Sequence, residues 1–447
     1  MKKRRFPSGP NSIVPFKLFM KFKANPLHFL ENMAKTYGDV SYMRLGLQHI
    51  YLINDPELIK DVLVTRDSKF SKGRTLGRAK VLLGNGLITS GGEFHKRQRR
   101  LVTPAFHRLQ IARYAEIMVQ SADQVSRTWK NTQTLDIWEE MMQLTMVIIC
   151  KTMFGFNVEA DAKEVGQAFT DILDKFDIVN MPYDNLVNKL PLPSVRRFKK
   201  ARDRLDLLIF QMIEERRNKP ETGEDLLSML LSAQDSEDDG KKMTDVQVRD
   251  EAMTLFLAGH ETMANGLTWT WYLLSKNPHV AEKLMTELHT VLNGRLPTID
   301  DVPLLVYTEK VLSESMRLLP PVWLLERIVV EDIELGGFHV PKQSIVLMSQ
   351  YIAHRDERFW PDAEMFDPER WTPEAKGLRP LYSYFPFGGG SRKCIAQGFA
   401  VMEGVLLIAT LAQRWKMDVS PDFPLQLSPK ITLRPQFGLP VTMEKRQ

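Results

Sequence analysis

The stretch Phe385-Pro-Phe-Gly-Gly-Gly-Ser-Arg-Lys-Cys394-Ile-Ala396 decides how the rest of this chain is interpreted. Three consecutive glycines permit backbone conformations that other residues avoid, just ahead of a helix predicted from near Cys394 to about Trp415. Unpaired N–H groups and the positive end of the dipole at the start of that helix favour the thiolate. Phe387 can cover the sulfur, and Arg392 adds a cation nearby. The loop therefore predicts an anionic sulfur ligand for a metal.

Other kinds of site fit this loop less well. A phosphate-binding loop needs Gly-Lys-Ser/Thr after its glycines, and a dinucleotide-binding Gly-x-Gly-x-x-Gly would have glycine where Lys393 stands. A papain-like cysteine nucleophile has a histidine downstream, whereas the last histidine of this chain, His354, lies upstream of Cys394. An inert buried cysteine remains the plain structural alternative.

Composition excludes several classes of protein. The chain has 447 residues, of which 43% are hydrophobic and 26% charged, and this argues against a disordered or collagen-like protein. Its net charge of +5 is small and spread along the chain, so we expect no nucleic-acid partner. The two cysteines, Cys150 and Cys394, cannot make a disulfide framework or a four-thiolate zinc site.

No apolar run approaches the roughly 18 to 20 residues that a transmembrane helix needs. Residues 267–274 and 405–412 are among the longest and fall short. The basic start of the chain, residues 2–5, is not followed by an apolar core, so we expect a cytoplasmic protein. Residues 13–30 are basic and mildly amphipathic, which is compatible with weak peripheral membrane contact. A solvated N-terminal arm over residues 1–30 is the alternative.

The hydrophobic pattern predicts one large, mainly helical body with a small β-rich part, forming a single domain over residues 1–447. Helical spacing dominates from about residue 55 to 317. Strands are expected at 40–45, 50–53, 327–335 and 338–346, and a last pair within 425–443; the stretch 354–387 is expected to be irregular.

A second motif, Ala258-Gly-His-Glu261-Thr262, lies inside a helix predicted from Asp245 to Lys276. Gly259 costs about 1 kcal/mol relative to alanine in mid-helix, so local preference and global pattern disagree there. The Thr262 hydroxyl can bond the carbonyl one turn back and open the helix into a groove, beside the titratable Glu261. A plain packing role for Gly259 remains open.

The limits of this helix come from local signals, and one rival site is excluded. Thr244 and Gln247 form a capping box at the start, and Pro278 follows the end. A zinc motif His-Glu-x-x-His would need histidine where the chain has Ala264.

Two further motifs supply charges. Glu314-Ser-Met-Arg317 places an acid and a base on one helix face, and Asp367-Pro-Glu-Arg370-Trp371 adds a second arginine that can reach back to Glu314. The prediction is a partly buried triad of one anion and two cations. A surface ion pair and a solvated arginine are the alternatives.

Taken together and in this order, the four motifs resemble those of the cytochrome P450 family of haem-thiolate monooxygenases: F-x-x-G-x-R-x-C, A-G-x-E/D-T, E-x-x-R and P-E-R-x. The resemblance covers essentially the whole chain. It implies the cytochrome P450 fold, with haem b (iron protoporphyrin IX) between the long central helix and the helix after the cysteine loop. Cys394 would be the axial ligand of the iron, and Ala258 and Phe387 would lie against the haem.

The resemblance also implies roles for the other motif residues. Thr262 and Glu261 would manage oxygen and protons in the notch opened by Gly259, and Glu314, Arg317 and Arg370 would form the structural triad behind the cysteine loop. The two haem carboxylates would be held by His95, Arg99, Arg327 and Arg392.

This sequence departs from the family pattern at two positions. Ala396 stands where the family often has glycine, and His95 stands where it usually has tryptophan. Alanine is also small, and histidine can donate a hydrogen bond to a propionate in the same way.

The implied reaction activates O₂ with two external electrons and hydroxylates or epoxidises a hydrophobic small molecule such as a fatty acid, terpenoid or steroid-like compound. A lid is expected around residues 176–192. The residues expected to line the substrate pocket are apolar: Leu255, Phe256, Val322, Trp323, Leu324 and Phe437.

No flavin or iron–sulfur module fits within the chain, so the resemblance implies a ferredoxin or flavodoxin with its NAD(P)H-dependent reductase. We expect four basic residues to steer that acidic partner: Lys96, Arg97, Arg100 and Lys393. We expect the enzyme to be a monomer. A haem-thiolate peroxygenase or isomerase, and a haem-based sensor or carrier, are the rival functions. The Glu261-Thr262 pair argues against both.

Overall fold

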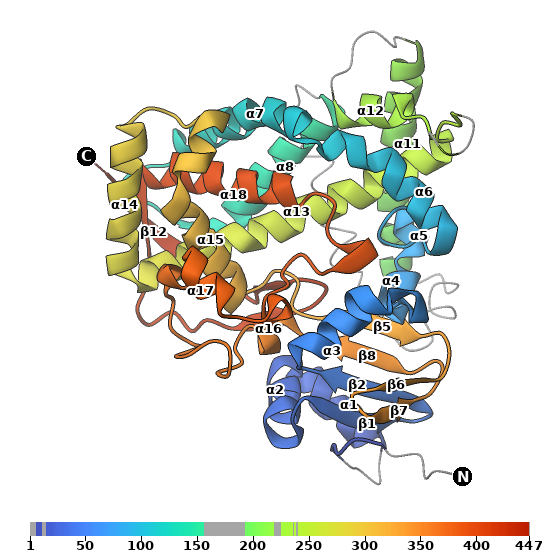
Figure 1. Ribbon diagram of the computed structural model, residues 1–447. Helices are drawn as coiled ribbons and strands as arrows, with labels where there is room; N and C mark the ends of the chain where they lie inside the picture. The colour runs from blue at the N-terminus through green and yellow to red at the C-terminus, as the bar shows by residue number, and fades with distance from the viewer. Residues whose placement is uncertain are drawn as a thin grey trace, which may run out of the picture.

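A computed structural model describes residues 6–10, 15–155, 193–218, 225–235, 237 and 240–446 of the chain. A helical body adjoins a smaller sheet-containing part, which lies with the N-terminus at the lower right of Figure 1. The mainly helical fold class predicted from the sequence is confirmed. The lid expected at 176–192 lies outside the described residues. None of the described helices combines the length and apolar character required to cross a bilayer.

The centre of the body is α13 (Asp245–Lys276), which crosses the molecule in Figure 1. The helix starts and ends as predicted, because the Thr244 hydroxyl accepts the Gln247 N–H at 3.3 Å and the Gln247 side chain accepts the Thr244 N–H at 2.9 Å. Nearly every residue from 248 to 271 is buried. Such a helix, apolar on most sides, can only be stable in the middle of a core.

Other helices surround α13 or link it to the sheet. The helices before it are α3 (Pro56–Lys60), α4 (Arg74–Arg78), α5 (Lys80–Leu83), α6 (Gly92–Val102), α7 (Arg108–Ser126), α8 (Ile137–Phe154), α11 (Pro193–Asn218) and α12 (Leu226–Ser232). Those after it are α14 (Pro278–Leu292), α15 (Val306–Leu318), α16 (Gln350–Ala353), α17 (Pro373–Gly377) and α18 (Gln397–Ala412). Of these, α8 and α15 pack most extensively on α13, and α5, α11, α12, α14 and α18 also contact it.

Short single-turn helices complete the connections. They are η1 (Asp61–Thr65), η2 (Asp67–Lys69), η3 (Thr103–Phe106), η4 (Ile299–Leu304), η5 (Pro368–Trp371), η6 (Leu381–Ser383) and η7 (Gly390–Arg392). Three of the seven, η5, η6 and η7, lie within the stretch 354–387 that was expected to be irregular or in the cysteine loop after it.

The largest sheet has the strand order β1-β2-β8-β5-β3. Its strands are β1 (Val40–Leu45), β2 (Gln48–Ile53), β3 (Phe70–Lys72), β5 (Leu325–Val329) and β8 (Ile345–Met348). Only the β2–β8 pairing is parallel; the other three neighbours are antiparallel. This sheet brings β3, from early in the chain, beside β5 from the second half, and so aligns Lys72 with Arg327.

The two strands expected at 327–335 and 338–346 divide between two sheets. A short hairpin turns at Gly336-Gly337, where β6 (Ile333–Leu335) pairs with β7 (Phe338–Val340). The flanking β5 and β8 join the large sheet instead. The chain turns between β7 and β8 at Gln343, whose φ is +67° and whose N–H donates to Val329.

The remaining strands form two small sheets on the body. β4 (Thr134–Asp136), β12 (Pro440–Lys445) and β9 (Trp415–Val419) make a three-stranded antiparallel sheet. β10 (Leu427–Pro429) pairs with β11 (Leu433–Pro435). The predicted pair in the tail is therefore present, and β12 is an addition.

The expected N-terminal arm is largely helical and packed. Helices α1 (Pro15–Ala24) and α2 (Pro26–Tyr37) lie beside β1 and β2. Leu27, Leu30 and Met33 of α2 are buried in the same core cluster as α13. Residues from 15 onward therefore belong to the folded body.

Candidate active site

The cysteine loop is held in a conformation that requires glycine. Gly388 and Gly390 have φ of +68° and +65°. A Cβ added to Gly390 would lie 1.8 Å from the Leu63 carbonyl oxygen of η1, so no side chain fits there. The Cys394 N–H donates to the Phe387 carbonyl at 2.9 Å and closes the loop. The backbone freedom predicted for the glycines is confirmed at these two positions.

The Cys394 side chain is exposed on one side, yet protein surrounds the sulfur closely enough to raise its pKa through desolvation. The Ala396 N–H, Arg99 and Lys393 act in the opposite direction. α18 begins at Gln397, three residues later than predicted, so the cysteine precedes the helix rather than lying in its first turn. Desolvation therefore outweighs the expected dipole effect, and coordination to a metal would supply the deprotonation.

A buried charge triad lies behind this loop. Glu314 accepts from Nε and Nη2 of Arg317 at 2.9 and 2.8 Å, and both side chains are fully buried. Trp371 Nε1 donates to the same carboxylate at 3.0 Å. Arg370 Nε lies 3.4 Å from Glu314 Oε1, at ion-pair rather than hydrogen-bond quality. The three predicted charges are thus brought together, and their burial excludes the surface alternative.

A histidine that the sequence did not single out connects the triad to the cysteine loop. Arg317 Nη1 donates to the His354 carbonyl at 2.9 Å, and the Phe385 N–H donates to His354 Nε2 at 2.9 Å. Burial, together with the nearby Arg317 and Arg355 charges, holds the pKa of His354 well below its usual value. A neutral ring can accept through Nε2, so the histidine fixes the start of the loop.

Five basic side chains from different elements form a cationic cluster near the cysteine loop. They share mutual repulsion, and within the described part of the chain none has an ion pair: Lys72, His95, Arg99, Arg327 and Arg392. Burial and then Arg392 lower the pKa of Lys72 to about 6, that of His95 to about 3 and that of Arg327 to about 10. Basic side chains whose charged forms burial disfavours normally carry charge only beside an anion, so the cluster fits the carboxylates of an anionic group.

Backbone carbonyls accept hydrogen bonds from three members of this cluster. Lys72 donates to the carbonyls of Leu87 and Ile88, and Arg392 donates to Ser90 at 3.1 Å. Arg99 donates to the Lys393 carbonyl at 2.8 Å, next to Cys394. The sequence analysis missed Lys72, whose only local signal is its place at the end of a short strand.

The middle of α13 is the one part of that helix between residues 248 and 271 that is not buried. Leu257, Ala258, Gly259 and Thr262 are half-exposed there. The Thr262 hydroxyl donates to the Ala258 carbonyl at 2.6 Å, as its position one turn later predicted. A Cβ on Gly259 would lie 2.8 Å from Ile149 Cδ1 of α8, so a side chain there would displace the end of Ile149, and the glycine also has a packing role.

Glu261 points toward the turn between β10 and β11. Its side chain is 5% exposed, and Oε1 accepts the Thr432 hydroxyl at 2.6 Å. Asn265 Nδ2 donates to the same hydroxyl at 3.1 Å. The acid predicted from the motif is therefore tied to a residue 171 positions away.

The structure corrects two of the six residues expected to line a substrate pocket. Phe256 is 1% exposed and packs between Phe154 of α8 and His260, at ring distances of 6.1 and 6.2 Å. Phe437 is 67% exposed beside the tight approach of Gly438 to Asp136, at the start of α8. Neither side chain lies at the half-exposed middle of α13.

The other four expected lining residues divide by exposure. Val322 and Leu324 are half-exposed, whereas Trp323 between them is buried and donates to the Lys430 carbonyl at 2.8 Å. Leu255 is 7% exposed and lies in the core cluster. Partly buried aliphatic side chains packed on that cluster are further lining candidates that the sequence analysis missed: Ile88, Leu257, Ile395 and Ile431.

Two of the four cations expected to steer a redox partner have internal partners. Arg97 and Arg100 of α6 both pair with Asp235, which is 1% exposed, at 3.0 and 3.2 Å. Lys96 pairs with Glu93 one turn away, and the side chains of Lys96 and Glu93 both remain exposed. The ion pairs of Asp235 with these two arginines fix the turn after α12. The exposed cations of that set are Lys96 and Lys393.

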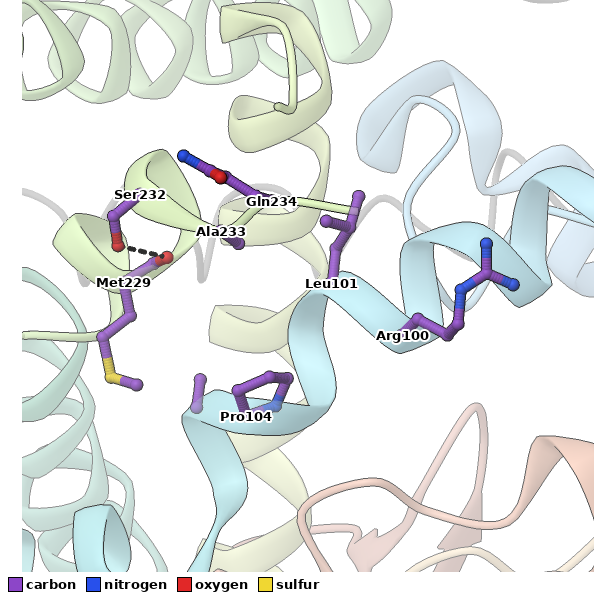
Figure 2. A pocket seen from close by; sticks show the side chains of 8 residues that line it. Arg100, Leu101, Pro104, Met229, Ser232, Ala233 and Gln234 are labelled. Atoms are coloured by element: carbon purple, nitrogen blue, oxygen red, sulfur yellow. Dashed lines mark hydrogen bonds between the residues drawn. The ribbon is translucent and has the colours of Figure 1, made fainter. Parts of the chain in front are cut away.

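A small apolar cavity of ≈ 170 Å³ lies between the end of α6 with η3 and α12. Figure 2 shows Leu101 and Pro104 on one side and Met229 on the other, with Arg100 at the edge. It contains neither the cysteine nor the half-exposed residues of α13. Among the described residues, no group of three or more His, Cys, Asp or Glu side chains could hold a metal ion.

Comparisons with known proteins agree with this geometry. The profile of the cytochrome P450 family matches residues 7–440. Cyclooctatin synthase from Streptomyces melanosporofaciens is 41% identical over 93% of this chain and 89% of its own length, and cyclooctat-9-en-7-ol 5-monooxygenase from the same organism is 36% identical over 93% and 90%. Pentalenene oxygenase from Streptomyces avermitilis is 34% identical over 89% and 88%. The chain therefore belongs to the cytochrome P450 family of haem-thiolate monooxygenases.

Proposed function

We propose that this enzyme hydroxylates or epoxidises a terpenoid, using Cys394 as the iron ligand of haem b. The observation that carries the proposal is the convergence of one accessible sulfur with five basic side chains that lack ion pairs among the described residues. The substrate class is supported by two relatives whose names denote oxygenation of terpenoid-type compounds, the 5-monooxygenase and pentalenene oxygenase. Apolar, half-exposed Val322, Leu324 and Leu257 suit such a molecule.

The residues present fit a haem with two propionates. A porphyrin carrying two carboxylates would neutralise the cationic cluster, and a single thiolate is the ligand that haem-thiolate proteins use. His95, Arg99, Arg327 and Arg392 are the proposed propionate ligands, and Lys72 joins them on the same grounds. Phe387 and Ala258 are the proposed haem contacts, one beside the sulfur and one on α13.

When bound, the haem supplies the chemistry of O₂ activation. The chain positions the substrate, excludes water and delivers protons. Thr262 presents its hydroxyl from the half-exposed middle of α13, where Gly259 allows the helix backbone to pack closely on Ile149 of α8. Glu261 is proposed to hold and release the protons that the reaction consumes. The buried Glu314, Arg317 and Arg370 hold the cysteine loop rigid through His354.

The electrons are proposed to come from a ferredoxin or flavodoxin with its NAD(P)H-dependent reductase. Lys96 and Lys393 support docking of an acidic partner because both are exposed, and Lys393 adjoins the ligand. The enzyme is proposed to be a monomeric, cytoplasmic protein of one domain. Lys17, Met20 and Lys21 share an exposed face of α1, which supports weak peripheral contact with anionic lipid.

Two variants test this proposal. Cys394→Ser should abolish the thiolate-type absorption of the reduced carbonyl complex, and survival of that spectrum would refute the ligand assignment. Thr262→Ala should retain haem but release peroxide in place of hydroxylated terpenoid. Normal coupling between nucleotide consumption and product would remove Thr262 from the reaction.

A panel of cyclic terpenes, fatty acids and steroids, read by substrate-induced spectral shifts and product analysis, tests the substrate class. Turnover of the terpenes alone supports the proposal. Turnover confined to fatty acids or steroids contradicts it.

A further inference from the structure

A chain of hydrogen bonds runs through three side chains and ends on Glu261. Trp138 Nε1 donates to Asn265 Oδ1 at 2.9 Å, Asn265 Nδ2 donates to Thr432 Oγ1 at 3.1 Å, and Thr432 Oγ1 bonds Glu261 Oε1 at 2.6 Å. Thr432, Asn265 and Glu261 are all at most 5% exposed. The participants come from α8, α13 and the turn between β10 and β11, so only the folded chain assembles them.

The directions of the first two bonds in this chain are determined by the indole of Trp138. An indole N–H can only donate, so the amide of Asn265 must present its oxygen to Trp138 and its NH₂ group to Thr432. The Thr432 hydroxyl then receives a donor from Asn265 and directs its own proton to the carboxylate oxygen. The first two bonds cannot reverse while the indole stays in place, and the third points toward Glu261 when its carboxyl group is ionised.

The turn that carries Thr432 is fixed independently of Glu261. Trp269 Nε1 donates to the Leu433 carbonyl at 3.0 Å, and the Leu433 N–H donates to the Pro321 carbonyl at 2.8 Å. Trp323 Nε1 holds the Lys430 carbonyl at 2.8 Å on the other side of the threonine. The hydroxyl is thus held in place by the backbone on both sides, and its position is set before it meets the acid.

A donor aimed at a carboxylate stabilises the ionised form, and the short Thr432 contact is at the length of a charge-assisted O–H···O⁻ bond. Burial acts in the opposite direction. At the far end of these bonds, the Arg434 guanidinium lies 6.0 Å from the Trp138 ring centre. His260, the neighbour of Glu261, is occupied with the Met142 carbonyl at 2.9 Å, and burial lowers its pKa to about 4.

We propose that Trp138, Asn265 and Thr432 form a one-way chain of donors that holds Glu261 as a carboxylate between turnovers. Thr432 and Asn265 are then positioning residues for the acid of the proposed reaction, on which this inference rests. A carboxylate in this state can accept a proton arriving from solvent and later give up the same proton, which returns it to its starting charge.

Substitutions that remove or reverse a hydrogen-bond donor without changing the size of the side chain separate this mechanism from simple packing. Thr432→Val keeps the shape and removes the donor, whereas Thr432→Ser keeps the donor and is the matched control. Asn265→Asp replaces the NH₂ group by an acceptor, so that the threonine proton is drawn away from Glu261. Trp138→Phe frees the amide to turn over, although position 138 is two side chains away from the acid.

The test is the infrared absorption of protonated carboxyl groups in the purified ferric protein, compared with the same protein carrying Glu261→Gln. At pH 7 the parent and Thr432→Ser should show no protonated signal that Glu261→Gln removes. Thr432→Val and Asn265→Asp should show one, and Trp138→Phe a weaker one. A signal already present in the parent, or an equal signal in Thr432→Ser and Thr432→Val, overturns the proposal.

Turnover supplies a second measurement. Thr432→Val and Asn265→Asp should increase the solvent deuterium isotope effect and the fraction of electrons released as peroxide by severalfold, whereas Thr432→Ser should match the parent. Equal coupling in all variants overturns the role in proton supply. If the infrared result fails while Cys394 still gives the thiolate spectrum, only this inference is lost; if the spectrum is absent, the proposed function fails and the infrared result stands alone.

Discussion

The buried triad allows a quantitative prediction for Glu314→Gln. In the protein, the Glu314 carboxylate is fully buried and accepts two bonds from Arg317, one from Trp371 Nε1 at 3.0 Å and one from the Asp367 N–H at 3.1 Å. Glutamine preserves the volume but offers one carbonyl oxygen and an NH₂ group. Two of the present donors would therefore face another donor, and the charges of Arg317 and Arg370 would lose their anion.

The expected cost is large because the remaining charges stay buried. Breaking a buried ion pair by removing one partner costs about 3–5 kcal/mol, a substantial part of the roughly 5–15 kcal/mol that stabilises a typical domain. Arg317 would keep its three bonds to backbone carbonyls, which places the cost within that range. The exposed pair Glu31–Lys35, also joined at 2.8 Å, is the control, since Glu31→Gln should cost about 0.3–0.5 kcal/mol.

Urea unfolding followed by far-ultraviolet circular dichroism measures both variants. Glu314→Gln should lose several kcal/mol and convert the thiolate-type spectrum to an inactive form at lower urea than the parent. Glu31→Gln should be indistinguishable from the parent in both measurements. A loss below 1 kcal/mol for Glu314→Gln would show that burial does not make this pair costly to break, and the argument would fail.

Three further predictions concern other buried groups. Burial lowers the pKa of His260 to about 4, so the unfolded chain binds the proton more readily than the folded protein does. The free energy of unfolding should therefore fall by up to about 3 kcal/mol as the pH drops from 6.5 to 4. In urea titrations, His260→Gln should flatten this dependence on pH. Burial raises the pKa of Glu403 to about 8, so its stabilising effect is lost as the pH rises from 4.5 to 8, and the melting temperature gained in Glu403→Gln should grow over that interval; a gain independent of pH contradicts this. Gly390→Ala should destabilise by at least about 2 kcal/mol, because φ is +65° and Leu63 leaves no room, whereas Gly377→Ala, with open space and ordinary φ, should not; equal effects would refute the steric argument.

Features set by local chemistry could be predicted from the sequence. The bounds of α13 follow from a capping box at Thr244 and a proline at 278, both of which act within one helical turn. The need for glycine in the cysteine loop likewise depends on a few neighbouring residues. By contrast, α18 begins three residues later than expected, because the residues after Cys394 first close the loop as a separate turn.

Features set by distant contacts could not be predicted. One residue along a helix is a rotation of about 100°, which is enough to turn Phe256 into the contact with α8 while Leu257 is half-exposed. Thr432 has no local signal at all, since its partner Glu261 comes from another element. The assignment of Phe437 failed for a related reason. The part of the tail that contacts α13 is the earlier turn between β10 and β11, which carries Thr432.

Three of the eight tryptophans, Trp138, Trp269 and Trp323, donate their indole N–H groups to the turn at residues 430–433 or to the asparagine beside it. The part of the intrinsic fluorescence that comes from these three side chains therefore reports on the turn that carries Thr432, the partner of Glu261. Emission colour and lifetime should respond to small molecules entering beside α13, which gives an optical signal that needs neither turnover nor a label.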